Sequence, residues 1–224
     1  MSVRKFLTVG LGLALAAGGV FAVAGSAHAA EAAAPTARQI LARAGQNCRV
    51  VSDGKLATDD GRAGTVNVCK AGSGLVFRAD LDIDCDGVAT RECAADRTRG
   101  SDTAVHTSKG RPFNPVTSHY YVLPIPTAKF SYARQGIRPG SVAAIIYHDK
   151  LVYAVFADVG PRNVLGEASY SVAKALGINA NPNTGGVDSG VTYVVFPGQV
   201  PGPVESNAAM DAKGRSAAAA FLRS

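Results

Sequence analysis

The chain has 224 residues, 47% of them hydrophobic and 18% charged, with 25 Gly, 11 Pro, 4 Cys and no Trp. That composition excludes a coiled coil, a collagen-like fibre and a wholly disordered chain, because each needs a far more biased amino-acid usage. The formal net charge is +6, and it falls to +4 (21 basic and 17 acidic residues) if Arg4 and Lys5 are removed with a leader. Such a modest excess, without a Lys/Arg run, argues against nucleic acid as a partner.

Residues 1–29 have the pattern of a secretory signal peptide. Arg4 and Lys5 precede an apolar stretch from Phe6 to Gly25 that contains five glycines. Ala27 and Ala29 fit the small-residue cleavage rule, so we expect cleavage after Ala29. The alternative is a retained membrane anchor, because the stretch approaches the roughly 20 residues that span a bilayer, but the glycines favour removal. We therefore expect a secreted, extracellular monomer without a membrane contact once the signal is removed.

The cysteines indicate disulfide bonds. Cys48, Cys69, Cys85 and Cys93 form an even set in a chain that we expect to reach an oxidising compartment, which favours two disulfides over a metal cage or a catalytic thiol. No C-x-x-C spacing is present, which argues further against zinc or redox chemistry. Of the three pairings that four cysteines allow, we favour the sequential one, Cys48 with Cys69 and Cys85 with Cys93, because it closes two short loops.

The mature chain has the size of one domain. Its N-terminal segment, residues 30–46, is expected to hold a short helix from Pro35 to Ala44 that ends at Gly45. Residues 47–200 form the main domain, and residues 201–224 form a C-terminal extension with a further helix over residues 217–222. We expect a mainly β (α+β) fold with a central β-sheet that could close into a barrel and a few peripheral helices.

Short apolar runs separated by Gly, Pro and Asp predict strands in the main domain. Because these runs are almost continuously apolar, both faces of the sheet should be covered. The middle two should form a hairpin around His148-Asp149-Lys150. A helix is predicted over Glu167–Leu176, ending at Gly177. The four clearest strands are Tyr120–Ile125, Val142–Tyr147, Leu151–Ala157 and Val191–Phe196.

A first cluster that could carry chemistry is acidic. Asp80, Asp82, Asp84 and Asp86 occupy alternate positions, so in an extended segment all four point to one side. Like charges packed together raise some of the pKa values unless a cation lies among them. The sequence therefore predicts a positive partner for this cluster.

Three interpretations of this cluster remain open. The first is calcium, because Asp82-x-Asp84-x-Asp86-Gly87 matches the opening of an EF-hand loop, although the closing Glu position holds Cys93. The second is a cationic substrate, because residues 76–96 carry six acids and two arginines, a local charge of −4. The third is structural, with the carboxylates accepting hydrogen bonds in turns around a disulfide loop.

A second cluster contains two carboxyl groups at the ends of rigid elements. Asp158 ends an apolar strand, a turn follows through Gly160-Pro161, and Glu167 is predicted to open the helix. Two carboxyls that face one cleft can hydrolyse a glycosidic bond, one as acid and the other as base or nucleophile. The structural alternative is that Glu167 complements the helix dipole and Asp158 makes ordinary turn hydrogen bonds.

Five strings in this order extend from about residue 74 to residue 198, and together they resemble the chitosanases of glycoside hydrolase family 75, of the secreted fungal and bacterial type. The strings are Asp80-Leu-Asp-Ile-Asp-Cys-Asp-Gly87, Tyr121-Val-Leu-Pro-Ile-Pro126, Ala157-Asp-Val-Gly-Pro161, Gly166-Glu-Ala-Ser-Tyr170 and Val194-Val-Phe-Pro-Gly198. The resemblance implies that residues 47–200 are a catalytic domain that hydrolyses β-1,4 links inside chitosan with inversion, with no cofactor and no metal needed for the chemistry. It places the catalytic residues on Asp158 and Glu167. Ala157 and Val159 stand where the family has Gly and Thr.

Chitosan is a polyamine when protonated, so an acidic cluster suits it as a partner. We expect Asp80, Asp82, Asp84 and Asp86 to bind substrate, and Tyr121 and Tyr170 to offer stacking surfaces in a chain without Trp. We assign Glu167 as general acid and Asp158 as general base, although the dipole of the predicted helix would oppose a protonated Glu167. The alternatives are a secreted module that binds calcium or a wall polymer without hydrolysis, and a hydrolase of another amino-sugar polymer.

Overall fold

The structure, a computed structural model, describes residues 33–224, and the predicted signal peptide lies outside these residues. Residues 34–224 form one unit, in which no helix is long and apolar enough to cross a membrane. The elements of this described part are, in chain order, α1 (Ala37–Ala44), β1 (Arg49–Val50), β2 (Cys69–Ala71), β3 (Gly74–Asp84), β4 (Tyr120–Pro124), the 3₁₀ helix η1 (Ala133–Gln135), β5 (Val142–Tyr147), β6 (Lys150–Gly160), β7 (Glu167–Ser169), α2 (Tyr170–Leu176), β8 (Val187–Val195) and α3 (Asn207–Leu222).

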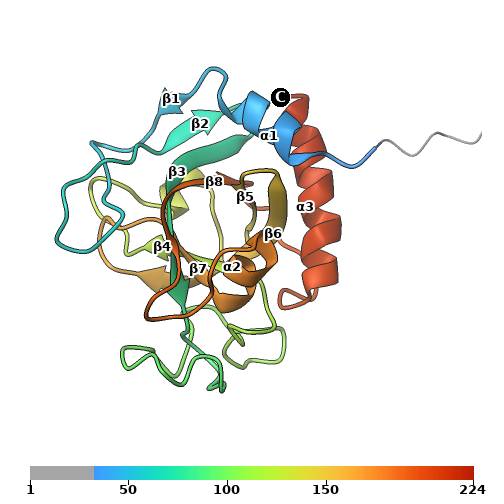
Figure 1. Cartoon of the computed structure of the whole chain (residues 1–224). Coiled ribbons are helices and arrows are strands. Elements are labelled where there is room, and N and C mark those ends of the chain that lie inside the picture. The colour runs from blue at the N-terminus through green and yellow to red at the C-terminus, as the bar shows by residue number, and fades with distance from the viewer. Residues whose placement is uncertain (1–32) are drawn as a thin grey trace, which may run out of the picture. The chain divides into compact units, whose positions relative to one another are not determined.

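Six strands of this unit close into a barrel (Figure 1). They follow the order β3-β7-β4-β6-β5-β8, and β8 pairs back onto β3. β5 and β6 form the predicted hairpin, whereas β4 pairs with β6, and β7 with β3, in parallel. β1 and β2 extend the sheet from β3 outside the ring. The mainly β fold and the barrel-like sheet are therefore confirmed.

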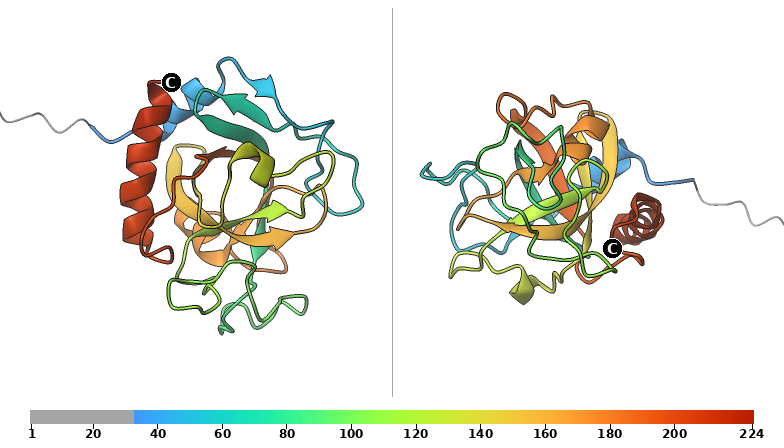
Figure 2. Two further views of the ribbon diagram at one scale, coloured as in Figure 1. Left: turned by 180° about the vertical axis from the view of Figure 1, so that it is seen from behind. Right: turned by 90° about the horizontal axis from the view of Figure 1, so that it is seen from below.

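Two apolar clusters cover the two faces of these strands, since successive side chains on a strand point to opposite sides. One cluster combines alternate strand residues such as Leu81, Phe156 and Tyr193 with residues of α2. The other combines the intervening strand residues with residues of α1 and α3. Because α1 and α3 lie outside the ring (Figure 2), the first cluster fills the barrel interior. Both faces are apolar, which explains why the strands read as continuous apolar runs.

The helix α3 lies along the outside of the barrel against β5 and β6 (Figure 1). At Gly214 a Cβ atom would lie 2.2–2.9 Å from atoms of Tyr153 on β6, so the absent side chain allows this close approach. The end of α3 also meets α1, where the Arg43 guanidinium lies 5.3 Å from the centre of the Phe221 ring. Both predicted terminal helices are present, and α3 begins ten residues before the predicted 217.

The predicted start of the helix at Glu167 is wrong. Glu167–Ser169 is strand β7, paired in parallel with Asp82–Asp84 of β3, and the helix begins only at Tyr170. Ser169 does not cap this helix, because its hydroxyl donates to the carbonyl oxygen of Ser118, 3.0 Å away. The pairing with β3, which is distant in sequence, overrides the local helical pattern. The sequential disulfides Cys48–Cys69 and Cys85–Cys93 are confirmed.

Candidate active site

Asp158 is turned to the outer face of the barrel by a β-bulge. Tyr121 pairs with Phe156, but the next residue, Val122, pairs with Asp158, so β6 has one extra residue at this point. The Asp158 side chain is only 6% exposed. Its Oδ1 accepts hydrogen bonds from the backbone N–H of Ala104 (2.9 Å) and of Val159 (2.7 Å). Its Oδ2 is buried and has no hydrogen-bond partner among the described residues.

Glu167 is the first residue of β7, directly opposite Asp82 of β3. Its side chain is partly exposed. The strand end of β6 makes room for it, because a Cβ atom on Gly160 would lie 2.9 Å from the Glu167 Oε2 atom. Glycine at this position therefore lets the Glu167 carboxyl pass close to the end of the strand that carries Asp158.

Asp158 and Glu167 line the same cavity, of about 360 Å³. Its wall comes from the ends of β3, β4 and β6, from β7 and from the loop that the Cys85–Cys93 disulfide closes. Asp84 and Asp86 belong to this wall as well, so the structure brings together four of the six acids expected at the site. The lining residues are Ile83, Asp84, Cys85, Asp86, Asp96, Thr98, Val122, Ile125, Asp158, Val159, Gly160, Pro161 and Glu167.

Asp84 is a third carboxyl at the centre of this cavity wall. It is 5% exposed and accepts a hydrogen bond from the backbone N–H of Asp86 at 2.6 Å. The Tyr120 hydroxyl lies 3.2 Å from its Oδ1 and 2.9 Å from the carbonyl oxygen of Asp86, so this hydroxyl fixes both residues. Asp84, Asp86 and Asp158 each bring one oxygen within 4.8 Å of the others.

The two candidate catalytic carboxyls differ in acidity. Burial, followed by the charges of Asp82, Asp86 and Asp158, raises the pKa of Glu167 to about 7. Burial also raises the pKa of Asp158, but two backbone N–H donors act against it and the value is about 6. Burial and the neighbouring carboxylates raise the pKa of Asp84 well above its usual range. Near neutral pH the cavity therefore holds both protonated and ionised carboxyls.

Glu167 does not lie in the first turn of a helix. The sequence predicted an opposing helix dipole for a Glu in the first turn of a helix, but Glu167 lies in β7, three residues before α2 begins at Tyr170. Burial and like charges both favour the protonated form of Glu167.

The remaining expected substrate-binding residues lie elsewhere. Tyr121 is fully buried and donates its hydroxyl hydrogen bond to the carbonyl oxygen of Ser141 at 3.1 Å, so its ring has no face open to a sugar. Tyr170 packs against the interior cluster and does not line the cavity. Asp80 and Asp82 form a separate group with Asp59.

Three residues of the site were not expected from the sequence. Asp96 and Thr98 line the cavity, and Tyr120 positions Asp84. Asp96 belonged to the acidic stretch that the charge count identified, so composition carried a signal for it. Thr98 and the role of Tyr120 had no local signal, because both depend on how the loop and β4 meet β3.

Two carboxyls with raised pKa values in one cavity are compatible with glycoside hydrolysis, which needs one carboxyl as proton donor and another as base or nucleophile. The chain belongs to the family described as fungal chitosanase of glycosyl hydrolase group 75, which matches residues 81–224. It is 30% identical over 132 residues to endo-chitosanase C of Aspergillus oryzae, covering 57% of this chain and 32% of that protein. It is 29% identical over 139 residues to an endo-chitosanase of the same organism, covering 55% and 57%. The chain thus spans about a third to just over half of the length of these relatives.

Proposed function

We propose that this protein hydrolyses β-1,4-glucosaminyl links within chitosan, with inversion at the anomeric carbon. Glu167 is the general acid and Asp158 the general base. The observation that carries the proposal is that Glu167 and Asp158, with pKa values of about 7 and about 6, line one cavity in a member of a chitosanase family.

The assignment of roles follows from the two environments. At a pH near 6.5 the Glu167 carboxyl mostly keeps its proton and can give it to the leaving oxygen. Asp158 is mostly ionised there. Its Oδ2 is buried and accepts no hydrogen bond from the described residues, and in this proposal it takes the proton of a water that enters the cavity beside it. Its Oδ1 is held by two N–H donors, which fix the direction of that oxygen. An inverting reaction needs this pair of functions on opposite faces of the sugar.

The cavity walls suit a cationic polymer. Asp84 and Asp86 lie beside Asp158, and we propose that they bind the ammonium group of a glucosaminyl unit. A neighbouring hollow of about 670 Å³ shares Ile83, Asp96 and Thr98 with the cavity and extends it towards Asn183. We propose that the two hollows together bind several units of the chain, as cleavage within a polymer requires.

Substitution of the two carboxyls tests the proposal. Glu167→Gln and Asp158→Asn should fold and bind chitosan but lose about 10²–10⁴-fold in kcat, since each removes one proton transfer. An aryl leaving group needs no proton, so an aryl glucosaminyl oligomer should restore much of the rate in Glu167→Gln and none in Asp158→Asn. Asp149→Asn, in the exposed β5–β6 turn, is the matched control and should be fully active.

Several outcomes would overturn this proposal. Near-normal turnover in either variant removes that residue from the mechanism. Chitosan binding by the wild-type protein without release of reducing ends would identify a binding module instead. The anomeric configuration of the product that forms first, observed by NMR, tests inversion, because an inverting enzyme releases the α-anomer from a β-linkage.

We also propose that the protein is exported, and a mature N-terminus at Ala30 in protein recovered from the culture medium would support this.

A further inference from the structure

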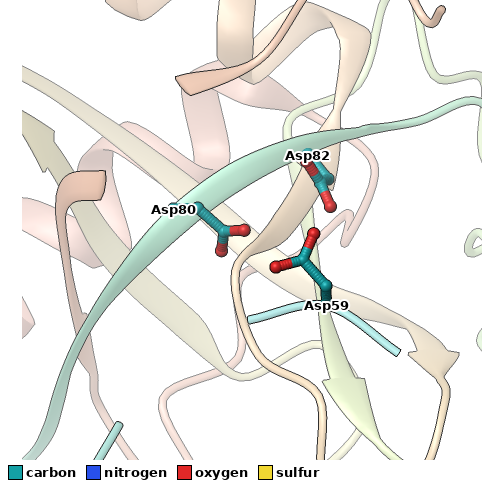
Figure 3. A group of neighbouring side chains, drawn as sticks. All are labelled: Asp59, Asp80 and Asp82. Carbon is teal, nitrogen blue, oxygen red and sulfur yellow. The ribbon is translucent and has the colours of Figure 1, made fainter. Parts of the chain in front are cut away.

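A second acidic group lies on the barrel surface, outside the cavity. Asp59, Asp80 and Asp82 each bring one carboxylate oxygen within 4.8 Å of the others. Asp80 and Asp82 belong to β3, whereas Asp59 comes from the loop between β1 and β2. Figure 3 shows the three carboxyl groups pointing toward a common space between the strand and the loop.

Asp80 distinguishes this group from an ordinary acidic surface. Its side chain is only 4% exposed, and its Oδ1 has no hydrogen-bond partner in the part of the chain that the structure describes. Gly166, at φ +116°, packs closely against this oxygen: a Cβ atom added to Gly166 would lie only 1.6 Å from the Asp80 Oδ1 atom. A buried carboxylate without a donor is costly unless a cation or a proton neutralises it.

No basic side chain of residues 33–224 forms an ion pair with these carboxylates. Asp188 of β8 adds a fourth negative charge that acts on both Asp80 and Asp82. Within residues 33–224 the structure has one ion pair, between His106 and Asp102, and it does not involve this group.

We propose that Asp59, Asp80 and Asp82 bind a calcium ion. Carboxylate oxygens are the ligands of hard divalent cations, and the absence of His or Cys from the group argues against zinc or copper. Three carboxylates from a strand and an exposed loop leave part of the ion open to water, which suits the flexible six- to eight-fold coordination of calcium better than the strict octahedron of magnesium. The local sequence pattern of an EF-hand plays no part, because Asp84 and Asp86 belong to the other cavity.

The ion has a structural role in this proposal. It joins the β1–β2 loop to β3, and β3 in turn holds the segment before Glu167, since the Asp82 backbone N–H donates to the Gly166 carbonyl oxygen at 2.7 Å. The ion touches no residue of the cavity that contains Asp158. Its loss should therefore lower the melting temperature. Because the charge of Asp82 acts on Glu167, the melting temperature, and not the rate of hydrolysis, is the readout of the structural role.

Calcium binding to the full mature protein tests the proposal directly. Protein stripped with EDTA and dialysed free of it should bind calcium in a titration calorimeter with a dissociation constant in the micromolar to millimolar range. Saturating CaCl₂ should raise the melting temperature by about 5 °C or more, and MgCl₂ at the same concentration should raise it much less. Asp59→Asn should abolish this rise, whereas the matched neighbour Asp60→Asn, outside the group, should keep it.

The outcomes separate the proposal from its rivals. No binding heat and no thermal shift in the wild-type protein up to about 10 mM calcium, roughly ten times the weakest dissociation constant of extracellular calcium modules, would overturn it, and so would an equal loss of the shift in Asp59→Asn and Asp60→Asn. If Asp59→Asn keeps the calcium shift but raises the KM for chitosan, the group is a substrate subsite and the metal proposal fails. Because the binding heat and the thermal shift are measured without substrate, these two results do not depend on whether the protein hydrolyses chitosan.

Discussion

Asp158 and Glu167 line one cavity but have different pKa values, because their surroundings differ. Asp158 is the more buried of the two, yet two N–H donors stabilise its charged form. Glu167 faces Asp82, Asp86 and Asp158, whose charges all favour its protonated form. Burial alone would have raised both pKa values without deciding which residue keeps the proton. In the proposed mechanism, the bulge in β6 and the short strand β7 therefore give Asp158 and Glu167 the surroundings that distinguish base from acid.

This division predicts a narrow bell-shaped dependence of kcat/KM on pH. Below about pH 6 Asp158 becomes protonated and loses its function as a base, and above about pH 7 Glu167 ionises and loses its proton. The two limbs belong to the interacting pair rather than to either residue alone. Rates on a soluble glucosamine oligomer between pH 4 and pH 9 check this expectation.

A neighbouring charge tests the alkaline limb of this pH profile. Asp86 raises the pKa of Glu167, so Asp86→Asn should move this limb to lower pH. Asp149→Asn, in the exposed hairpin turn, should leave the limb in place. An alkaline limb that is the same in all three proteins would contradict the assignment of Glu167 as the acid.

At the scale of elements, local patterns predicted the strands β4, β5, β6 and β8, the β5–β6 hairpin and the helices α1, α2 and α3, but not the short strands β1, β2 and β7 or the other strand pairings. The run of Ala, Val and Leu after Glu167 is helical in period, and α2 does form. The first three residues of that run join β3 instead, because β7 fills the gap between β3 and β4 and closes the barrel. No local signal reveals this closure, since β3 lies some 80 residues earlier in the chain.

The acidic cluster shows the same limit. Alternation predicted a common side for Asp80, Asp82, Asp84 and Asp86 in an extended segment, but β3 ends at Asp84, so Asp86 lies beyond the strand. A strand also rises about 3.3 Å per residue. Asp80 and Asp86 are six residues apart, so one side of the strand serves two separate groups. The sequence identified the acids, while the loops that meet them, with Asp59 at one end and Asp158 at the other, depend on tertiary structure.

Removal of each disulfide should separate stability from activity. In the chain-entropy account, loss of Cys85–Cys93, with a sequence separation of 8, costs about 2.5 kcal/mol, and loss of Cys48–Cys69, with a separation of 21, costs about 3.3 kcal/mol. Only the Cys85–Cys93 loop contributes to the cavity wall. We expect the Cys85→Ala/Cys93→Ala variant to lose on the order of tenfold in kcat/KM through displaced groups.

Urea unfolding and kinetics on the two double variants measure these effects, with Cys48→Ala/Cys69→Ala as the matched control. That control should be the less stable of the two and still have nearly wild-type kinetics. If both variants lose activity in proportion to stability, the smaller loop does not organise the cavity.

At the scale of the whole molecule, the barrel contains several carboxyl groups whose surroundings favour the protonated form. Asp80, Asp158 and Glu167 have folded-state pKa values of about 8, about 6 and about 7, all above the values of free side chains. The excess of basic residues in the chain does not relieve them, since the described part contains a single ion pair. Burial of these ionisable groups therefore costs stability at two places in the barrel, the cavity that contains Asp158 and Glu167 and the separate group that contains Asp80.

The sign of this cost can be measured. Because the folded state binds protons more tightly than the unfolded state, these groups contribute full stability below their unfolded pKa values near 4, and the contribution is lost as the pH rises toward the folded values of about 6 to about 8. The free energy of unfolding should therefore fall from pH 5 to pH 8.

Glu167→Gln removes one such group and should be more stable than wild type by about 1–2 kcal/mol at pH 8, after a discount for its partial exposure. The gain should nearly vanish at pH 4.5, and the surface control Glu205→Gln should show no gain at pH 8. A wild-type stability that rises between pH 5 and pH 8 in urea titrations without calcium would mean that these carboxyls are not held in the proton-binding surroundings described above.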